Sequence, residues 1–469
     1  MPLTFFPFSA TILPEHPASG GSEDLCFPAG DRSGTGEKRR RFRVRVFLPY
    51  GSSHITCEIP DSRLRAILSP KLPEAEEKTG EAIVRASLAR PAGSPPLREL
   101  AGGKKNVVIL SSDHTRPVPS AVIMPLLLEE IRAGNPGADI TILVATGCHR
   151  STTEDELEER YGTEIVRSVR IVVHDSLDEN SLVSVGTLPS GGELVLNRLA
   201  VEADLLVAEG FIEPHFFAGF SGGRKSVLPG VAAYRTVLAN HCAEFIASPG
   251  ARTGILEGNP IHEDMVYAAR KAGLAFICNV VLDPQKRITA AFSGDMEKAH
   301  EEGCAFLSRL AKVQAVPADI VITGNGGYPL DQNIYQAVKS MTAAEASCRP
   351  GGIIIEAAEC RDGHGGEAFY HAFRDIPTAR GVLDSILARG RDSTEPDQWE
   401  IQIFARILMN HTVILVTSAP RETAEYMNMK WAPSLQDALA LAEEILGDGN
   451  AAVTVIPDGV SVIVDTPEK

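Results

Sequence analysis

Histidine, arginine and lysine residues gather just after short β-branched runs in this sequence. Asp113 and Arg116 follow the first such run, and His149 follows the second. Histidine exchanges a proton near neutral pH, and arginine and lysine bind anions. One such residue after a strand is usually structural, so it is their joint occurrence that indicates a shared catalytic cleft. The later runs are followed by His215, Lys225, Tyr335, Gln336 and Lys339.

The apolar runs that precede these residues alternate with helical patterns. This alternation is typical of a mostly parallel sheet covered by helices on both faces, in which ligands bind beyond the carboxyl ends of the strands. The predicted strands are 42–48, 106–111, 139–146, 170–174, 204–209, 319–325, 352–358 and 412–417, and the predicted helices include 121–132, 153–161 and 435–446.

The pattern restarts after about residue 310, which predicts an α/β protein of two domains with the active site in the cleft between them. We expect an N-terminal catalytic and cofactor-binding domain over 42–310 and a C-terminal domain over 311–445. A closing hairpin within 446–469 is expected to rejoin the first domain. Residues 1–41 are rich in Pro and Gly and are expected to form a disordered or loosely packed extension.

Charge and composition exclude several classes of protein. The 469 residues carry a net charge of −16, which disfavours nucleic acid and anionic membranes as partners. The 8 cysteines contain no C-x-x-C pair, as expected for a reducing compartment rather than a disulfide scaffold. The sequence has no apolar run of membrane-spanning length and no signal-peptide pattern, so a cytoplasmic location is expected.

The glycine-rich segment 219–226 invites comparison with the phosphate-binding P-loop, G-x-x-x-x-G-K-[ST]. Arg224 stands where that motif requires glycine, and about ten residues separate the segment from its strand, so a nucleotide triphosphatase using Lys225 and Ser226 is a distant alternative. The flanking glycines could still present backbone N–H groups to the single phosphate of a mononucleotide. His241, sixteen residues after Lys225, is either a helix-terminal histidine or a lone metal ligand.

Taken together, the motifs resemble those of the nickel-dependent lactate racemases and related 2-hydroxyacid racemases and epimerases. The resemblance covers about residues 42–465 and is specific to this family rather than to one substrate. The matching motifs are Asp113-x-Thr115-Arg116-Pro117, Ala145-Thr-Gly-x-His149-Arg150, Pro214-His215-x-x-Ala-Gly-Phe-Ser-Gly-Gly-x-Lys225, Pro229-Gly230, Asn240-His241 and Tyr335-Gln336-x-x-Lys339.

The resemblance implies a nickel pincer cofactor, nickel pyridinium-3-thioamide-5-thiocarboxylic acid mononucleotide, bound covalently to Lys225. It implies that His241 is the protein ligand of nickel, alongside sulfur and carbon donors that suit a square-planar Ni(II) ion. Asp113 and Thr115 would line the cofactor site, and Gly222 and Gly223 would approach the cofactor phosphate.

The same resemblance implies that His149 and His215 are the acid–base pair of a proton-coupled hydride transfer. Arg116 would stabilise the substrate hydroxyl or ketone oxygen, and Lys339 with Gln336 would bind the carboxylate. Tyr335 and Trp399 match aromatic pocket positions, the tryptophan by spacing alone, which favours a small aliphatic substrate.

The predicted function is therefore racemisation or epimerisation at C2 of a 2-hydroxy acid, with lactate as first choice. Malate, larger 2-hydroxy acids and aldonic acids are alternatives within the class. Phosphoryl transfer and non-catalytic mononucleotide binding or storage are alternatives outside it. The expected partners are the small substrate and cofactor-synthesis proteins.

Overall fold

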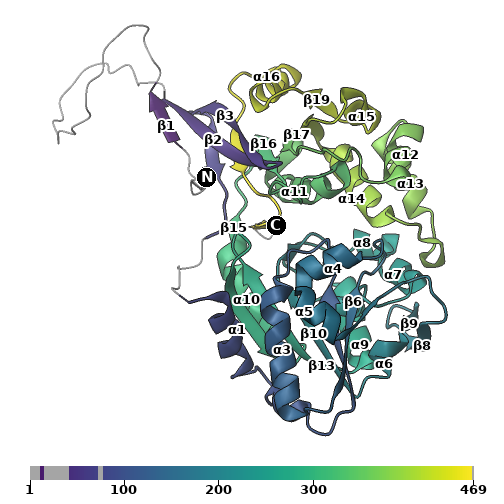
Figure 1. The fold of residues 1–469 in the computed structure, drawn as a ribbon. Helices are drawn as coiled ribbons and strands as arrows, with labels where there is room; N and C mark the ends of the chain where they lie inside the picture. The colour runs from purple at the N-terminus through teal and green to yellow at the C-terminus, as the bar shows by residue number, and fades with distance from the viewer. Residues whose placement is uncertain (1–10, 15–41, 72–77, 467–469) are drawn as a thin grey trace, which may run out of the picture.

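The computed structural model describes residues 11–14, 42–71 and 78–466. Two α/β domains lie one above the other in Figure 1, the N-terminal domain in blue and teal and the C-terminal domain in green and yellow. Each is built on a six-stranded sheet. The predicted two-domain α/β fold with mostly parallel sheets is confirmed.

The N-terminal sheet has the strand order β14-β13-β10-β5-β6-β7, and every neighbouring pair is parallel except β13 with β14. Its strands are apolar on both faces because helices cover both: Val107 and Ile109 pack towards α1–α5, whereas Val108 and Leu110 pack towards α7–α9. The strands are β5 (Asn106–Ser112), β6 (Asp139–Ala145), β7 (Arg170–Val173), β10 (Leu205–Phe211), β13 (Leu274–Leu282) and β14 (Ile288–Gly294).

The helices of this domain include the predicted 121–132 and 153–161 segments, within one to two residues at each end. They are α1 (Gly80–Leu88), α2 (Leu97–Leu100), α3 (Ser120–Gly134), α4 (Glu154–Tyr161), α5 (Thr163–Ser168), α6 (Arg198–Val201), α7 (Tyr234–Asn240), α8 (Ala243–Ala247), α9 (Pro260–Ala272) and α10 (Lys298–Ala311), with a 3-10 turn η1 (Gly223–Ser226). Two short antiparallel pairs complete it: β8 (Leu182–Thr187) with β9 (Glu193–Asn197), and β11 (Pro214–His215) with β12 (Gly219–Phe220).

The C-terminal sheet is entirely parallel, in the order β19-β18-β17-β16-β20-β4. Its strands are β16 (Ala318–Gly324), β17 (Cys348–Ala357), β18 (Thr412–Val416), β19 (Lys430–Ala432), β20 (Val453–Ile456) and β4 (Leu64–Ile67). Its helices are α11 (Ile334–Ser347), α12 (Glu367–Asp375), α13 (Ala379–Leu387), α14 (Gln398–Asn410), α15 (Arg421–Tyr426) and α16 (Leu435–Leu446), with a 3-10 turn η2 (Arg391–Ser393).

The closing segment corrects the predicted domain boundaries. β20 lies inside the C-terminal sheet between β16 and β4, and β21 (Ile463–Asp465) pairs with β15 (Lys312–Gln314) rather than with β20. The segment is therefore not the expected hairpin, and β20 belongs to the second domain, but Ile463 of β21 does pack with Ile212 and Phe220 of the first domain. Alternating apolar residues in 452–464 fit a hairpin and two buried parallel strands equally well, so periodicity could not separate them.

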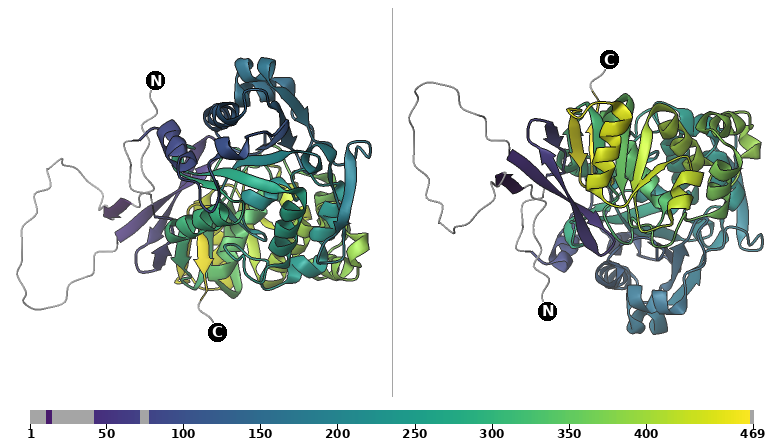
Figure 2. Two further views of the ribbon diagram at one scale, coloured as in Figure 1. Left: turned by 90° about the horizontal axis from the view of Figure 1, so that it is seen from below. Right: turned by 90° about the horizontal axis from the view of Figure 1, so that it is seen from above.

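Residues 42–67 also belong with the C-terminal domain, although they were predicted to open the first. β2 (Phe42–Tyr50) and β3 (Ser53–Pro60) form an antiparallel hairpin, drawn in purple beside the yellow strands in Figure 2. Val46 and Leu48 pack onto Ile320 and Ile355 of the C-terminal sheet. Within the predicted extension, Thr11–Pro14 forms strand β1 on β2, and the remainder of 1–41 lies outside the described residues.

Helix starts near the cleft are set by side-chain caps. Asn333 caps α11 by accepting a hydrogen bond from the Gln336 amide, which orients the first turn that carries Tyr335. Thr153 and Glu156 form a capping box on α4, just after His149. Among the residues that the structure describes, no helix is long and apolar enough to cross a membrane.

We predict that Leu48→Ala destabilises the C-terminal sheet selectively. Leu48 is fully buried, so its truncation should lower the free energy of unfolding by about 2–5 kcal/mol. Hydrogen exchange should rise in β16 and β17 before it rises in β5. In the matched Leu110→Ala variant β5 should lose protection first, and the same order in both variants would show that β2 does not belong to the C-terminal domain.

Candidate active site

A cavity of about 840 Å³ lies between the two domains and receives side chains from both. The N-terminal domain supplies the loops after β5, β6 and β10 together with η1 and α7, and the C-terminal domain supplies α11 and α14. The predicted site residues that line this cavity are Asp113, Thr115, Arg116, His149, His215, Gly222, Lys225, His241, Tyr335, Gln336, Lys339 and Trp399.

Asp113 orients the first histidine of the cavity. Its Oδ2 lies 2.7 Å from His149 Nδ1, and its Oδ1 accepts a 2.6 Å hydrogen bond from the Thr115 hydroxyl. A carboxylate at Nδ1 holds the ring proton there, which leaves Nε2 able to accept a proton. Burial alone would raise the pKa of Asp113, but His149 and Arg116 hold that pKa well below its usual range.

Arg160, which the sequence analysis did not single out, holds the loop that carries Asp113 and Arg116. Its Nη2 donates to the backbone oxygens of Asp113 and Arg116, the latter at 2.8 Å. Its Nη1 donates to Ser120 Oγ, which in turn donates to the buried carboxyl of Glu209. The only sequence signal for Arg160 is a basic residue in the last turn of α4, a common feature that does not mark a site.

His215 lies among aromatic rings. It stacks on Phe216 with ring centroids 5.0 Å apart and meets Phe217 edge-on at 4.6 Å. Burial, followed by the charges of Lys225 and Lys339, lowers the pKa of His215 well below its usual value. The ring is therefore neutral at pH 7, and its Nδ1 accepts the Ala218 amide at 3.3 Å.

Arg224 explains why the glycine-rich segment is not a P-loop. Its buried guanidinium donates to the backbone oxygens of Ala218, Phe220 and Gly222 at 2.8–3.1 Å. It also contacts His262 Nδ1 and His300 Nε2 at 3.0 Å. The Arg224 side chain would prevent the loop backbone from wrapping around a phosphate. It fills the interior of the loop instead.

Gly223 corrects one predicted site residue. It does not line the cavity, and its N–H donates to Asn279 Oδ1 at 2.7 Å, so this amide is not available to a cofactor phosphate. Gly222 does line the cavity, with a φ of 79°. A Cβ at Gly222 would lie 2.8 Å from both Phe211 O and Asn279 Oδ1, which explains the glycine by close packing.

Lys225 and His241 both lie next to the ring of Phe217. Lys225 Nζ lies 5.7 Å from the Phe217 centroid, and the His241 ring lies 5.1 Å from the same centroid. Burial, with the charges of Arg224 and Arg116, lowers the pKa of the Lys225 amine well below its usual value. Burial, with the charge of Lys225, lowers the pKa of His241 to about 3.

His241 has a buried ring nitrogen that could serve as a metal ligand. It lies at the C-terminal end of α7, and its buried Nδ1 has no hydrogen-bond partner among the described residues. Those residues also contain no cluster of three or more His, Cys, Asp or Glu side chains that could hold a metal ion. Within the described part of the chain, His241 therefore does not belong to a ready-made protein metal site.

The C-terminal domain closes the cavity with cationic and aromatic groups. Lys339 Nζ donates to Gln336 Oε1 at 2.5 Å and lies 5.9 Å from the Phe216 centroid. Trp399 Nε1 donates to the Tyr335 hydroxyl at 3.1 Å, and the Trp399 ring lies 5.0 Å from the His241 ring. Trp399, placed by spacing alone, is thus in contact with the predicted metal ligand.

The cavity also contains residues that sequence reasoning missed. Phe216 and Phe217 lie inside the motif that carries His215, so their position was visible although their role was not. Asp397 and Glu400 line the cavity from the start of α14, where only the nearby tryptophan gave a signal.

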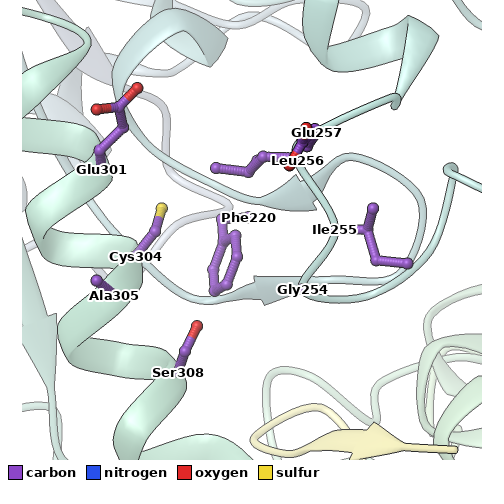
Figure 3. A pocket seen from close by; sticks show the side chains of 9 residues that line it. All are labelled: Phe220, Gly254, Ile255, Leu256, Glu257, Glu301, Cys304, Ala305 and Ser308. Atoms are coloured by element: carbon purple, nitrogen blue, oxygen red, sulfur yellow. The ribbon is translucent and has the colours of Figure 1, made fainter.

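A second hollow lies beside α10 (Figure 3). It has a volume of about 400 Å³ and is mostly apolar, with Phe220, Ile255 and Leu256 beside Cys304. Burial raises the pKa of the Cys304 thiol to about 12, which makes this cysteine a poor nucleophile. The predicted catalytic side chains, His149 and His215, line the interdomain cavity, so the fold and the site indicate a two-domain α/β enzyme with a histidine-lined cleft.

Comparisons with known proteins identify the family. The lactate racemase N-terminal domain matches residues 50–254, and the lactate racemase C-terminal domain matches residues 313–464. The chain is 57% identical to the lactate racemase of Thermoanaerobacterium thermosaccharolyticum over 90% of its length and 99% of the relative's. It is 54% identical to the lactate racemase of Lactiplantibacillus plantarum over 90% of its length and 100% of the relative's. This chain belongs to the lactate racemase family.

Solved structures agree with this assignment. The lactate racemase apoprotein from T. thermosaccharolyticum matches with a TM-score of 0.87, over 90% of this chain and 100% of that one. That structure is of an apoprotein, which is a protein without its cofactor. A protein from Thermotoga maritima at 21% identity, with a TM-score of 0.62 over 84% of this chain and 100% of that one, shares the fold.

We predict that Asp113→Asn lowers the free energy of unfolding by about 1–3 kcal/mol at neutral pH, because the bond to His149 loses its charge. The depressed pKa of Asp113 means that its stabilisation is present above the ordinary aspartate pKa, about 3.9, and is lost as the pH falls through the lower folded value. Urea unfolding at several pH values should show that the difference in unfolding free energy between the wild type and Asp113→Asn becomes smaller as the pH falls. If this difference did not change with pH, the link between the Asp113 pKa and stability would be contradicted. The control is Asp384→Asn, since Asp384 is exposed.

Proposed function

We propose that this protein racemises lactate by proton-coupled hydride transfer and that it carries a nickel pincer nucleotide on Lys225. The observation that supports this most directly is the joint placement of Lys225, His241, His149 and His215 on one cavity. The 57% and 54% identities to lactate racemases favour lactate as substrate.

The residues present fit such a cofactor. Lys225 offers an amine whose pKa is lowered, so it is more often neutral and nucleophilic than an exposed lysine. His241 offers a buried imidazole nitrogen without a hydrogen-bond partner in the described chain. Both groups lie next to the Phe217 ring, the amine 5.7 Å and the imidazole ring 5.1 Å from its centroid. When bound, the cofactor would supply a hydride acceptor, which a plain 2-hydroxy acid needs because its carboxylate is a poor electron sink.

The two histidines would handle the hydroxyl proton from opposite sides. His149 Nε2 is free to take the proton because Asp113 holds the other ring nitrogen. His215 is neutral because burial and nearby cations disfavour its charged form, so it too can act as a base. One enantiomer would lose its hydroxyl proton to neutral His149 and the other to neutral His215, as a hydride leaves C2. The histidine on the opposite side would return a proton to the ketone oxygen as a hydride returns to C2, so that histidine must enter the reaction protonated and the pair carries one extra proton between its two rings.

The cations of the cavity would hold the substrate in place. Lys339, steadied by Gln336, would bind the carboxylate, and Arg116 would face the hydroxyl or ketone oxygen. The rings of Phe216, Tyr335 and Trp399 leave an apolar side suited to a methyl group. This lining favours lactate over malate and aldonic acids, which would bring a carboxylate or several hydroxyls against aromatic carbon.

Phosphoryl transfer has little support. Arg224 fills the loop, and the Gly223 amide is already bonded, so the backbone donors of a P-loop are missing. A storage protein would need Lys225 and His241 but not the bond between Asp113 and His149. That bond favours catalysis.

We predict that Lys225→Ala abolishes cofactor attachment. Protein coexpressed with cofactor-synthesis proteins and nickel should show an adduct in intact mass, and the variant should show the bare mass. The exposed Lys430→Ala variant should keep the adduct. An adduct that persists in Lys225→Ala would place the attachment elsewhere.

We predict that His149→Ala and His215→Ala each lower kcat for lactate by about 10²–10⁴-fold, the usual contribution of a positioned acid–base group. Chiral analysis of the product measures this loss, and the exposed His54→Ala variant should retain full activity. A loss below tenfold in either variant would remove that histidine from the pair.

We predict that lactate carrying deuterium at C2 turns over more slowly and keeps its label in the opposite enantiomer, because hydride does not exchange with water. Mass spectrometry of the separated enantiomers provides the measurement. Replacement of the label by solvent hydrogen would indicate proton abstraction at C2.

A further inference from the structure

Arg160 binds the loop between β5 and α3 at four points, and the proposed function gives it no role. It lies in the last turn of α4, and its side chain is half-buried. Its two terminal nitrogens donate to the backbone oxygens of Asp113, Arg116 (2.8 Å) and Val118 (3.4 Å) and to the hydroxyl of Ser120 (3.2 Å). A guanidinium suits this task because its planar fork can bond several oxygens at once.

Glu209 fixes the two ends of the same loop. Ser111, near the end of β5, and Ser120, at the start of α3, each donate a 2.5 Å hydrogen bond to Glu209 Oε1. The last two residues of α4 complete this network, since Tyr161 donates to Ser111 at 2.7 Å and Arg160 donates to Ser120. Glu209 lies on β10 and is fully buried. The sheet therefore holds the ends of the loop, and Arg160 holds the backbone between them.

The middle of this loop carries groups that the proposed chemistry needs. The Asp113 backbone oxygen that Arg160 binds also accepts the Arg116 amide at 3.2 Å, so Arg160 braces a turn over residues 113–116. From this turn the Asp113 carboxylate reaches His149 Nδ1 at 2.7 Å, and the Arg116 side chain lines the cavity. Hydrogen bonds weaken steeply once their angle and distance depart from the optimum, so a displaced turn would lose the contact with the imidazole.

Helix α4 joins this turn to the loop that carries His149. Its N-terminal end comes just after that histidine, where Arg150 donates to Glu156 in the first turn of the helix at 2.9 Å. Its C-terminal end carries Arg160. One helix of 8 residues therefore connects the two loops whose side chains meet in the cavity.

We propose that Arg160 is a positioning residue, which holds the turn over 113–116 so that Asp113 meets His149 and Arg116 reaches the cavity. Arg160 does not itself line the cavity, so it acts through the residues that it binds. The proposal rests on the proposed function only in giving the contact between Asp113 and His149 a part in catalysis. The dependence of that contact on Arg160 is a separate claim and can be tested by itself.

Nitrogen NMR of the complete chain, with histidine labelled at both ring nitrogens, tests this dependence without cofactor or substrate. Asp113 holds the ring proton of His149 on Nδ1. Arg160→Met keeps a long side chain but no donor, so more His149 rings should carry the proton on Nε2, and the Nδ1 signal should move towards that of an unprotonated nitrogen. Spectra are recorded at about pH 9, above the ordinary histidine pKa of about 6.5, and His149→Gln assigns the signal. An unchanged His149 signal would overturn the proposal.

A second histidine in the same spectrum separates this effect from a general loss of structure. His174 is buried in the same domain, with Nε2 3.1 Å from the Ala232 backbone oxygen and Nδ1 3.1 Å from Asn197 Nδ2. These contacts fix its ring proton independently of Arg160, so its signals should stay unchanged. Equal changes at His174 and His149 would show that the variant only loosens the domain, which would count against the proposal.

Two further variants test the part played by the guanidinium. Arg160→Lys keeps a donor but not the planar fork, so the His149 signal should move in the same direction as in Arg160→Met and by less. Arg167→Met removes an exposed arginine from α5 and should leave the spectrum as in the wild type. A His149 shift in Arg167→Met as large as that in Arg160→Met would contradict a specific role for Arg160.

Kinetics of the cofactor-loaded enzyme connect this positioning to the proposed function. Arg160→Met should lower kcat for lactate about 10²-fold, the usual cost of a misplacement of about 1 Å. Adding Asp113→Asn should lower kcat little further, because both changes act through one contact, whereas adding Gln336→Ala in the other domain should multiply the losses. Losses that also multiply with Asp113→Asn would count against the proposal.

The two measurements together distinguish failure of this proposal from failure of the proposed function. An altered His149 signal with an unchanged kcat would remove His149 from the acid–base pair and so contradict the proposed function, while Arg160 would still position the ring. An unaltered His149 signal would contradict the positioning role itself, whatever the kinetics.

Discussion

The Arg224 guanidinium is the interaction on which the rest of the site depends. Its hydrogen bonds to the backbone oxygens of Ala218, Phe220 and Gly222 fold the loop between β10 and α7 around one buried side chain. That loop carries His215 and Phe217 on one side and ends in Lys225. A lysine in place of Arg224 could not match this geometry, because an ammonium has three donors and no planar fork.

The interior of the cavity is cationic, although the chain as a whole carries a net charge of −16. Lys225, Arg116 and Lys339 line the cavity, and their charges lower the pKa of His215. This field serves both parts of the proposed chemistry. It attracts an anionic substrate, and it keeps the buried imidazoles neutral and so able to accept a proton or bind a metal.

Much of the fold could be predicted from sequence because its strands are short, apolar and separated by clear helical patterns. The 435–446 helix was predicted with the boundaries of α16. The position of β20 could not be predicted, because pairing between β20, β16 and β4 is decided by contacts among segments almost 400 residues apart. The same long-range packing places the β2–β3 hairpin on the C-terminal sheet.

The site shows a similar division. Motif order predicted which residues line the cavity, since strand ends of parallel sheets converge. It gave no indication that Asp113 would bond to His149, that Phe217 would contact both Lys225 and His241, or that Trp399 would hydrogen-bond the Tyr335 hydroxyl. Those relations depend on side-chain directions set by the turn at Arg224 and by the packing of α11 on α14. Gly223 shows that motif order can also mislead. It was predicted to approach the cofactor phosphate, but the structure explains this glycine by close packing.

X-ray absorption at the nickel edge of the loaded protein tests the central claim most directly, because it reports the atoms around the metal whether or not the enzyme turns over. The account predicts that His241→Ala removes one nitrogen scatterer with its imidazole shell while the sulfur shell remains. A spectrum identical to that of the wild type would contradict it, since the metal would then lie away from the cavity that Lys225 and His241 share.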